Sequence, residues 1–111
     1  MAAAASVDRE WTKEELVERG AKVYATNCAA CHQANGQGVP GAFPAIAGSP
    51  VATGDPAAHI NLVLNGKQGT AMAAYRDLLN DVDLAAVITY QRNSFGNDAG
   101  VVQPAAVQAA R

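Results

Sequence analysis

The sequence has few large aromatic side chains. Only two Phe, three Tyr and one Trp occur among its 111 residues, although half of the residues are apolar. That apolar half is enough for one compact core, but it is rich in Ala and supplies little bulky filling. We expect a single domain over residues 13–97, with a core that a large apolar ligand could complete.

Long apolar runs and clusters of positive charge are both missing. No stretch approaches the roughly 20 apolar residues that span a bilayer, and Met1–Val7 is too short for a secretory leader. The formal net charge is -2 and no Lys/Arg cluster occurs. Nucleic acid is therefore not an expected partner, because nucleic-acid binding needs a basic surface. Residues 1–12 are interpreted as a flexible leader outside the fold.

Cysteine is scarce, and both cysteines fall in one motif. Cys28 and Cys31 are followed at once by His32, which gives Cys-x-x-Cys-His, the attachment signature of c-type haem. Two residues three apart on a helix share one side, so both thiols can reach vinyl groups of one porphyrin. The next residue, His32, can then coordinate the iron. The motif predicts one haem c, covalently bound through Cys28 and Cys31.

Three other uses of this motif are open. A thioredoxin-like redox pair follows a strand in a βαβ unit, whereas a helix precedes Cys28. A structural zinc site needs four ligands, and only His59 remains beside the motif. A disulfide between the two cysteines would leave His32 unused and the core unfilled. Haem is the interpretation that accounts for all three residues.

Methionine is equally scarce, which narrows the choice of a second axial ligand. With Met1 set aside, Met72 is the only thioether, and His59 is the other possible ligand. Met72 lies in GKQGTAMAAY, where small residues allow the backbone to approach a flat ring. We expect His32 and Met72 to bind the iron. The alternatives are that Met72 merely fills the core, that His59 is the ligand, or that the sixth position is open.

Helical signals dominate the rest of the chain. A Thr12/Glu15 capping box predicts a helix at about 12–29, and Asp55, Pro56 and Gly66 bracket another at 56–65. Asn80 opens a C-terminal helix at about 81–93. No segment alternates with period two, so the domain should be all-α. Residues 35–56 are predicted to form a long structured loop, and residues 98–111 a mobile or loosely packed tail.

These residues resemble the class I cytochrome c fold, in which the N- and C-terminal helices cross and shorter helices and loops wrap one haem. Gly20 and Tyr24, facing Tyr90, look like that crossing. Pro44 looks like the family's proline whose carbonyl accepts a hydrogen bond from the haem histidine. The segments CAACHQANGQGVPGAFPAIAGS and VLNGKQGTAMAAYRDLLNDVDLAAVITYQRNSFGN are similar to the cytochrome c domain at the C-terminus of some bacterial cytochrome c oxidase subunits II. The likeness covers residues 13–97.

The resemblance implies a function in a respiratory chain. The domain would carry electrons from a soluble donor to the dinuclear copper centre of an oxidase, on the periplasmic side of a bacterial inner membrane. It would be a monomeric piece of a longer subunit, attached to the membrane only through that subunit, and no enzyme on its own. One alternative is a free, diffusible periplasmic cytochrome c, and another is a haem enzyme or gas sensor with an open sixth position.

Formal charge is nearly absent from the middle of the chain. Between Val23 and Gly66 the only charged side chain is Asp55, with His taken as neutral. We expect a mostly uncharged docking face around the haem edge, and a small, transient complex of less than about 1,200 Å². The alternative is that a loop rich in Ala and Gly simply has few charges.

Overall fold

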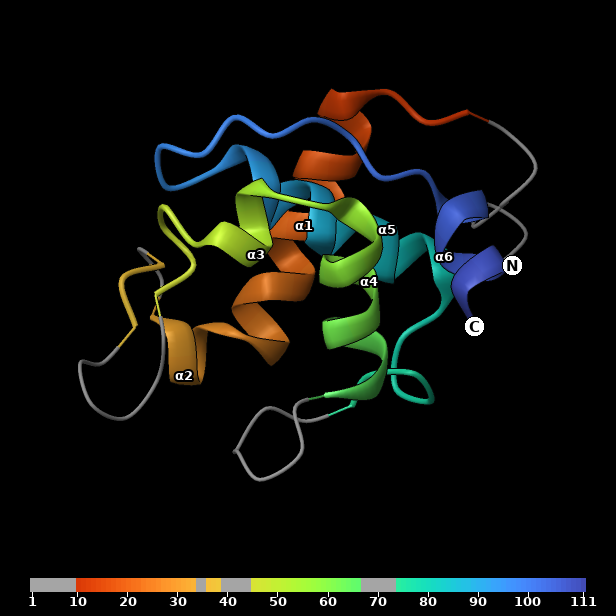
Figure 1. Ribbon diagram of the computed structural model, residues 1–111, viewed down its shortest axis with the longest axis horizontal. Coiled ribbons are helices and arrows are strands. Elements are labelled where there is room, and N and C mark those ends of the chain that lie inside the picture. Colours follow the sequence, from red (N-terminus) through yellow and green to blue (C-terminus); the bar gives the residue numbers. More distant parts are fainter. Residues whose placement is uncertain (1–9, 34–35, 39–44, 67–73) are drawn as a thin grey trace.

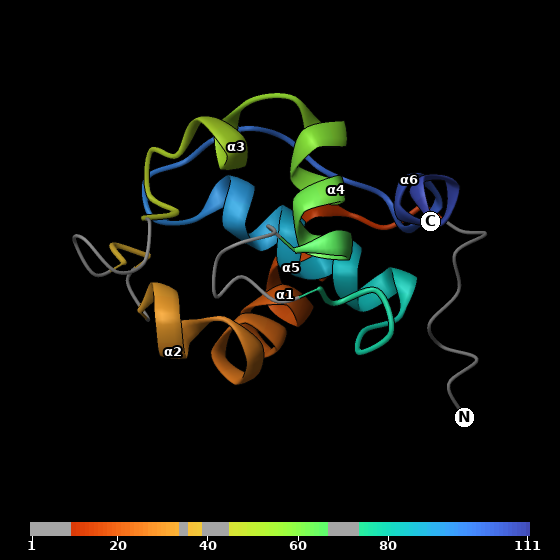
Figure 2. The same ribbon diagram turned by 60° about the horizontal axis from the view of Figure 1, so that its bottom comes forward.

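The chain folds into a set of packed helices. The computed structural model describes residues 10–33, 36–38, 45–66 and 74–111, and every regular element in these ranges is an α-helix. The helices are α1 (Lys13–Asn27), α2 (Ala29–His32), α3 (Pro50–Thr53), α4 (Pro56–Asn65), α5 (Asp81–Asn93) and α6 (Pro104–Ala110). α5 lies between α1 and α2 on one side and α3 and α4 on the other (Figure 2). Within the described ranges no helix has the length and apolar character needed to cross a bilayer. The all-α prediction is confirmed.

Side-chain caps fix where the main helices begin. The Thr12 hydroxyl accepts a hydrogen bond from the Glu15 backbone N–H at 3.1 Å, and the Glu15 carboxylate accepts one from the Thr12 N–H at 2.9 Å. Asp55 and Asn80 cap α4 and α5 in the same way, through single bonds of 3.0 and 2.8 Å. These bonds satisfy N–H groups that have no partner within the helix. The predicted bounds 56–65 and 81–93 are the observed ones.

A close approach of two backbones joins α1 to α5, as Figure 1 shows at the centre of the molecule. A Cβ atom built on Gly20 would lie 2.0 Å from the Ala86 carbonyl oxygen and 2.7 Å from the Tyr90 Cβ. Beside this crossing the rings of Tyr24 and Tyr90 are 5.3 Å apart, and both pack near Phe95. The predicted crossing through Gly20, Tyr24 and Tyr90 is confirmed.

The C-terminal segment differs from the prediction of a mobile tail. α6 packs against α5, and Val102, Pro104 and Val107 are buried. The Gln103 amide accepts a hydrogen bond from the Trp11 N–H and donates one to the Trp11 carbonyl, both at 2.9 Å. The buried Trp11 therefore belongs to the fold, although it was assigned to the leader. Small residues such as Ala suffice for this helix because it has only one side to bury.

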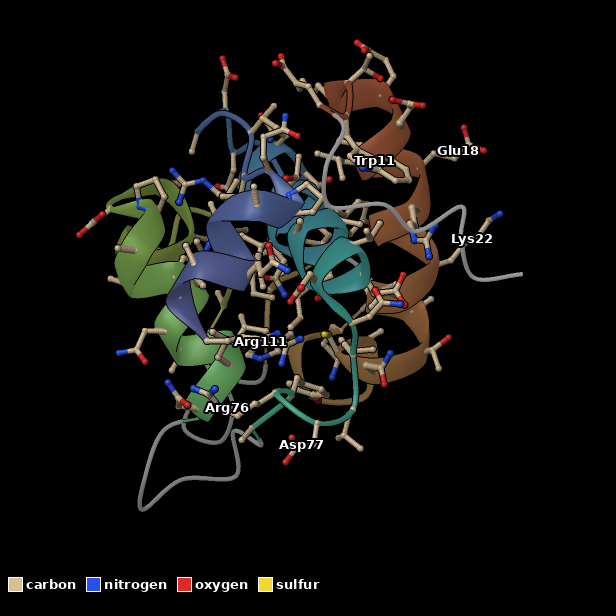
Figure 3. All side chains as sticks on the ribbon, turned by 90° about the vertical axis from the view of Figure 1, so that its right-hand side faces the viewer. Trp11, Glu18, Lys22, Arg76, Asp77 and Arg111 are labelled. Atoms are coloured by element: carbon tan, nitrogen blue, oxygen red, sulfur yellow. The ribbon has the colours of Figure 1, made fainter. Side chains whose placement is uncertain are left out.

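Charged contacts hold the last residue of the chain against the segment before α5. The Arg111 guanidinium pairs with Asp81 and donates to the Arg76 carbonyl, and to the Leu79 carbonyl at 2.8 Å. Figure 3 shows Arg111 and Arg76 near one another, with Trp11 farther up in the view. The C-terminal segment thus contacts both the start of the fold and the approach to α5.

The predicted loop over 35–56 contains one turn of helix that was not expected. In α3, the Thr53 N–H donates to the Ser49 carbonyl at 2.9 Å. Pro50 is compatible with this turn because proline at the first helical position needs no N–H partner. A high content of Gly and Pro excludes a long helix but not a single turn.

One imidazole lies inside the core. His59 is 3 % exposed, and its Nε2 lies 2.6 Å from the Gln91 side-chain oxygen, while Nδ1 has no hydrogen-bond partner among the described residues. Burial lowers the pKa of His59 from its ordinary 6.5 to about 4; the Gln91 hydrogen bond opposes this shift and Arg92 adds to it. His59 is therefore neutral at pH 7.

We predict that Gly20→Ala destabilises the fold. An alanine in a helix is normally favourable by about 1 kcal/mol relative to glycine, but here its methyl group would overlap the Ala86 carbonyl. Forcing the helices apart should cost about 1–3 kcal/mol of unfolding free energy. Denaturant unfolding measures this free energy. Lys22→Ala, on the exposed side of α1, is the control, and its unfolding free energy should stay within about 0.5 kcal/mol of the wild-type value. A Gly20→Ala protein at least as stable as the wild type would contradict the close crossing.

We predict that the buried His59 makes the fold less stable as the pH falls from 6.5 to 4. In this window the unfolded chain binds a proton that the folded His59 does not, so the unfolding free energy rises with pH. Relative to His59→Leu, the wild type should lose on the order of 3 kcal/mol between pH 7 and pH 4. Both proteins share the same carboxylates, so the contribution of these groups to the pH dependence cancels in the difference between the two unfolding free energies. A difference that does not change with pH would show that His59 titrates normally.

Candidate functional site

The Cys-x-x-Cys-His motif lies at the junction of α1 and α2. Cys28 ends α1 and precedes α2: its N–H donates to the Tyr24 carbonyl at 2.8 Å, and its carbonyl accepts from the His32 N–H at 3.0 Å. The Cys28 side chain is buried at 9 % exposure, and His32 is half-buried. Cys28 and His32 are therefore joined by one helical turn. The backbone of Cys31 lies in this turn, but its side chain is outside the described part of the structure.

The residue after the histidine has an unusual backbone conformation. Gln33 has φ 70° and ψ 157°, a region that is nearly restricted to glycine and costs of order 1–3 kcal/mol. Its carbonyl accepts a hydrogen bond from the Tyr24 hydroxyl at 2.7 Å. Burial raises the pKa of Tyr24 to about 12, so this hydroxyl keeps its proton. The bond fixes the chain beyond His32 against α1.

Asn97 connects the chain beyond the motif to α5. Its side-chain amide donates to the carbonyls of Ile46 and Gln91 at 3.0 and 2.9 Å, and its side-chain oxygen accepts from the Gly48 N–H at 2.8 Å. Asn97, whose side chain makes all three bonds, is only 8 % exposed. No role for Asn97 is predicted from the sequence. The one feature of the sequence that could have indicated this role is a polar residue, within RNSFGN, that follows a helix with many buried residues.

Gly36 allows two parts of the chain to meet closely. It has φ 71°, and a Cβ atom there would lie 2.5 Å from the Phe95 ring. Its carbonyl accepts hydrogen bonds from the N–H groups of Ile46 and Ala47, at 2.7 and 3.0 Å. These bonds fix the chain just after Pro44. Pro44 itself, the predicted partner of the haem histidine, lies outside the described residues.

Tyr75 links the other predicted ligand segment to the motif. Its hydroxyl donates to the Asn27 carbonyl at 2.9 Å, and its N–H donates to the Val63 carbonyl at 3.0 Å. It therefore joins α4 to the residue immediately before Cys28. Met72, three positions earlier in the sequence, lies outside the described residues, so its predicted ligation stays a prediction.

Gln91 on α5 lies close to the first cysteine of the motif. Its side-chain nitrogen lies 4.0 Å from the Cys28 sulfur, and its side-chain oxygen contacts His59. His59, one alternative axial ligand, is thus occupied with Gln91. Within the described residues no three His, Cys, Asp or Glu side chains are placed to hold a metal ion. A zinc site that recruits His59 is disfavoured by its contact with Gln91, and a thioredoxin-like site by the helix before Cys28.

Comparisons with known proteins agree on one family. The family model described as "Cytochrome C oxidase, cbb3-type, subunit III" matches residues 15–90, which include the motif. The chain is similar to the "Alcohol dehydrogenase (quinone), cytochrome c subunit" of Gluconobacter oxydans (strain 621H), with 37% identity over 103 residues, 83% of this chain and 22% of that protein. It is also similar to the "Cbb3-type cytochrome c oxidase subunit CcoP" of Azospirillum brasilense, with 33% identity over 97 residues, 82% of this chain and 32% of that protein.

A shorter stretch of the chain has a higher identity to another relative. Over 29 residues, 26% of this chain and 21% of the relative, the identity with "Cytochrome c-552" of Thermus thermophilus is 72%. The chain spans about a fifth to a third of the length of these relatives. The fold is all-helical, as expected for class I cytochromes c. From these matches we conclude that the chain belongs to the cytochrome c family, as a cbb3-type cytochrome domain that transfers electrons by means of covalently bound haem c.

Proposed function

We propose that this domain transfers single electrons through one haem c, attached to Cys28 and Cys31, with His32 and Met72 as its axial ligands. The haem supplies an iron that accepts and releases one electron. The observation that carries the proposal is the turn from Cys28 to His32, with the Cys28 sulfur buried between α1 and α5. A Met72 thioether bound to the iron would favour its reduced state, as would burial of the haem.

The residues present fit such a group. The chemistry of the donor set is that of haem c: two cysteines three positions apart and a histidine directly after them. The Cys28 sulfur faces the side-chain amide of Gln91, and His59 Nδ1 is a buried polar atom with no hydrogen-bond partner among the described residues. Three aromatic side chains, Tyr24, Tyr90 and Phe95, cluster at the helix crossing, and of the other described aromatic residues only Trp11 is buried.

Two hydrogen-bonded residues stand close in sequence to the other proposed site residues, Met72 and Pro44. Tyr75, which stands three residues after Met72 in the sequence, is hydrogen-bonded to the residue before Cys28, and this supports the proposal that Met72 is a ligand. Ile46 is held by Gly36 and Asn97 and stands two residues after Pro44. We propose that the Pro44 carbonyl accepts a hydrogen bond from the second nitrogen of His32, which would fix the imidazole and increase its basicity.

We propose that the domain belongs to a terminal oxidase and works on the periplasmic side of a bacterial inner membrane. The family description and the similarity to an oxidase subunit support an oxidase. The resemblance of RNSFGN and the preceding segments to the cytochrome c domain of subunit II implies an electron acceptor, the dinuclear copper centre of that subunit. It implies a soluble protein as the electron donor. Membrane attachment would come only from a longer parent subunit.

A second candidate is the cytochrome subunit of a quinone-dependent dehydrogenase. The observation that favours it is the 37% identity to such a subunit over 83% of this chain. The two proposals differ in the partner that exchanges electrons with the haem. In an oxidase the domain delivers electrons to a metal centre, whereas in a dehydrogenase complex it receives them from another subunit.

We predict that Met72→Ala leaves one coordination position of the haem iron open to added ligands. The reduced variant should bind carbon monoxide at neutral pH without denaturant, its reduction potential should fall because the thioether is lost, and the absorption band of sulfur-ligated ferric iron should vanish. His59→Leu is the matched control, because it removes the other possible ligand and should leave the reduced iron closed to carbon monoxide. Carbon monoxide binding by the wild type, or by His59→Leu alone, would contradict ligation by Met72.

We predict that the reduced domain passes its electron to the oxidised, soluble dinuclear-copper domain of an oxidase at a rate that hardly depends on ionic strength. Few charges lie near the site: Asp55 is the one charged side chain between Val23 and Gly66, so salt has little to screen. Stopped-flow mixing over a series of salt concentrations measures the rate. Absence of transfer would argue for the dehydrogenase alternative. A tenfold or larger fall with salt would contradict the uncharged docking face.

A further inference from the structure

Two buried polar side chains lie beside the motif and have no part in the proposed ligand set. His59 on α4 is 3 % exposed and Gln91 on α5 is 5 % exposed. They form a chain of contacts: His59 Nε2 to the Gln91 side-chain oxygen at 2.6 Å, then the Gln91 nitrogen to the Cys28 sulfur at 4.0 Å. Residues from three elements that are far apart in sequence thus form one line of contacts, which ends at the Cys28 sulfur.

The contacts define which way the amide of Gln91 points. A neutral imidazole carries one N–H, and the side-chain oxygen of Gln91 can only accept. His59 must therefore donate from Nε2, which leaves Nδ1 as the nitrogen without a hydrogen, and it has no partner among the described residues. With its oxygen held by His59, Gln91 presents its N–H₂ group to Cys28. The low pKa of His59 agrees with this arrangement, because the ring stays neutral at pH 7.

We propose that Gln91 is a positioning residue for the haem, whose side-chain N–H donates to the Cys28 sulfur, and that His59 orients Gln91 for this contact. The inference rests on the proposed function, in which this sulfur is bonded to the haem edge. A sulfur atom is a weak acceptor, and a bond at 4.0 Å is long, so the contact acts chiefly through the dipole of the amide.

The dipole has a definite sign. The positive end of the Gln91 N–H points at the sulfur and, through it, at the haem edge, where it favours the electron-rich reduced state. Burial strengthens this effect because little water is present to screen it. The pair should therefore raise the reduction potential of the haem.

A purely structural role explains the pair less well. Replacing two buried hydrogen-bonded side chains by apolar ones of similar shape is often neutral for stability, so packing alone does not require a histidine here. In the part of the chain that the structure describes, Nδ1 also finds no partner, and a buried polar atom without one costs free energy. Two leucines would fill the space without that cost.

The test compares reduction potentials in holoprotein purified with its haem. The variants are Gln91→Met, which keeps the length of the side chain but has no N–H, His59→Leu, and the double variant. Thr89→Val is the matched control: Thr89 is fully buried on α5, and among the described residues its hydroxyl bonds to the backbone of Val102 alone. Spectroelectrochemistry against a reference carrier gives the potential, and the absorption spectrum reports the attached haem.

We expect Gln91→Met to shift the equilibrium with the reference carrier toward the oxidised form by about threefold to tenfold, where tenfold is 59 mV for a one-electron couple. His59→Leu should give part of this shift, and the double variant no more than Gln91→Met alone. Thr89→Val should give none. Equal potentials in Gln91→Met and the wild type, with haem attached in both, would overturn the proposal; so would fully additive shifts from the two single variants.

A measurement on the wild type covers the case in which the variants fail to fold. In the reduced holoprotein, nuclear Overhauser effects should connect the Gln91 side-chain amide protons to the Cys28 β protons, and these amide protons should exchange slowly. Rapid exchange without such effects would overturn the proposal. Failure of the proposed function is distinguishable, because the wild type would then carry no covalent haem at all.

Discussion

The close crossing of α1 over α5 is the constraint on which the rest of the structure depends. Because Gly20 has no side chain, the backbone of α1 can approach the Ala86 carbonyl. That approach sets the position of the end of α1, where Cys28 lies, relative to the last turn of α5, where Gln91 lies. A larger residue at position 20 would separate the sulfur from α5 as well as the two helices.

Side chains from the helices fasten the irregular chain around this crossing. Tyr24 holds Gln33 after the histidine, Tyr75 joins α4 to the end of α1, and Asn97 fixes the chain on both sides of Ala47. Each bond links a side chain of one segment to the backbone of another. An electron carrier needs an environment that changes little between two oxidation states, and such fastening restricts movement of the site without a large aromatic core.

Much of the fold and part of the site could be predicted because their signals are local. The bounds of α4 and α5 follow from the caps Asp55 and Asn80, and the crossing follows from a glycine in mid-helix. α6 was missed because its stability comes from contacts with α5 and Trp11, which are distant in sequence. The same holds for Gln91: it lies within the predicted helix at 81–93, but nothing local could indicate that it faces Cys28 and His59.

The central claim is that a haem is bonded to this chain at Cys28 and Cys31. The most direct measurement is the mass of the denatured protein after production with haem-maturation machinery. The account predicts a mass raised by one haem that survives acidified acetone, and no such gain in a variant with both Cys28→Ser and Cys31→Ser. A wild-type chain of unmodified mass, or a haem that the acid extracts, would contradict it.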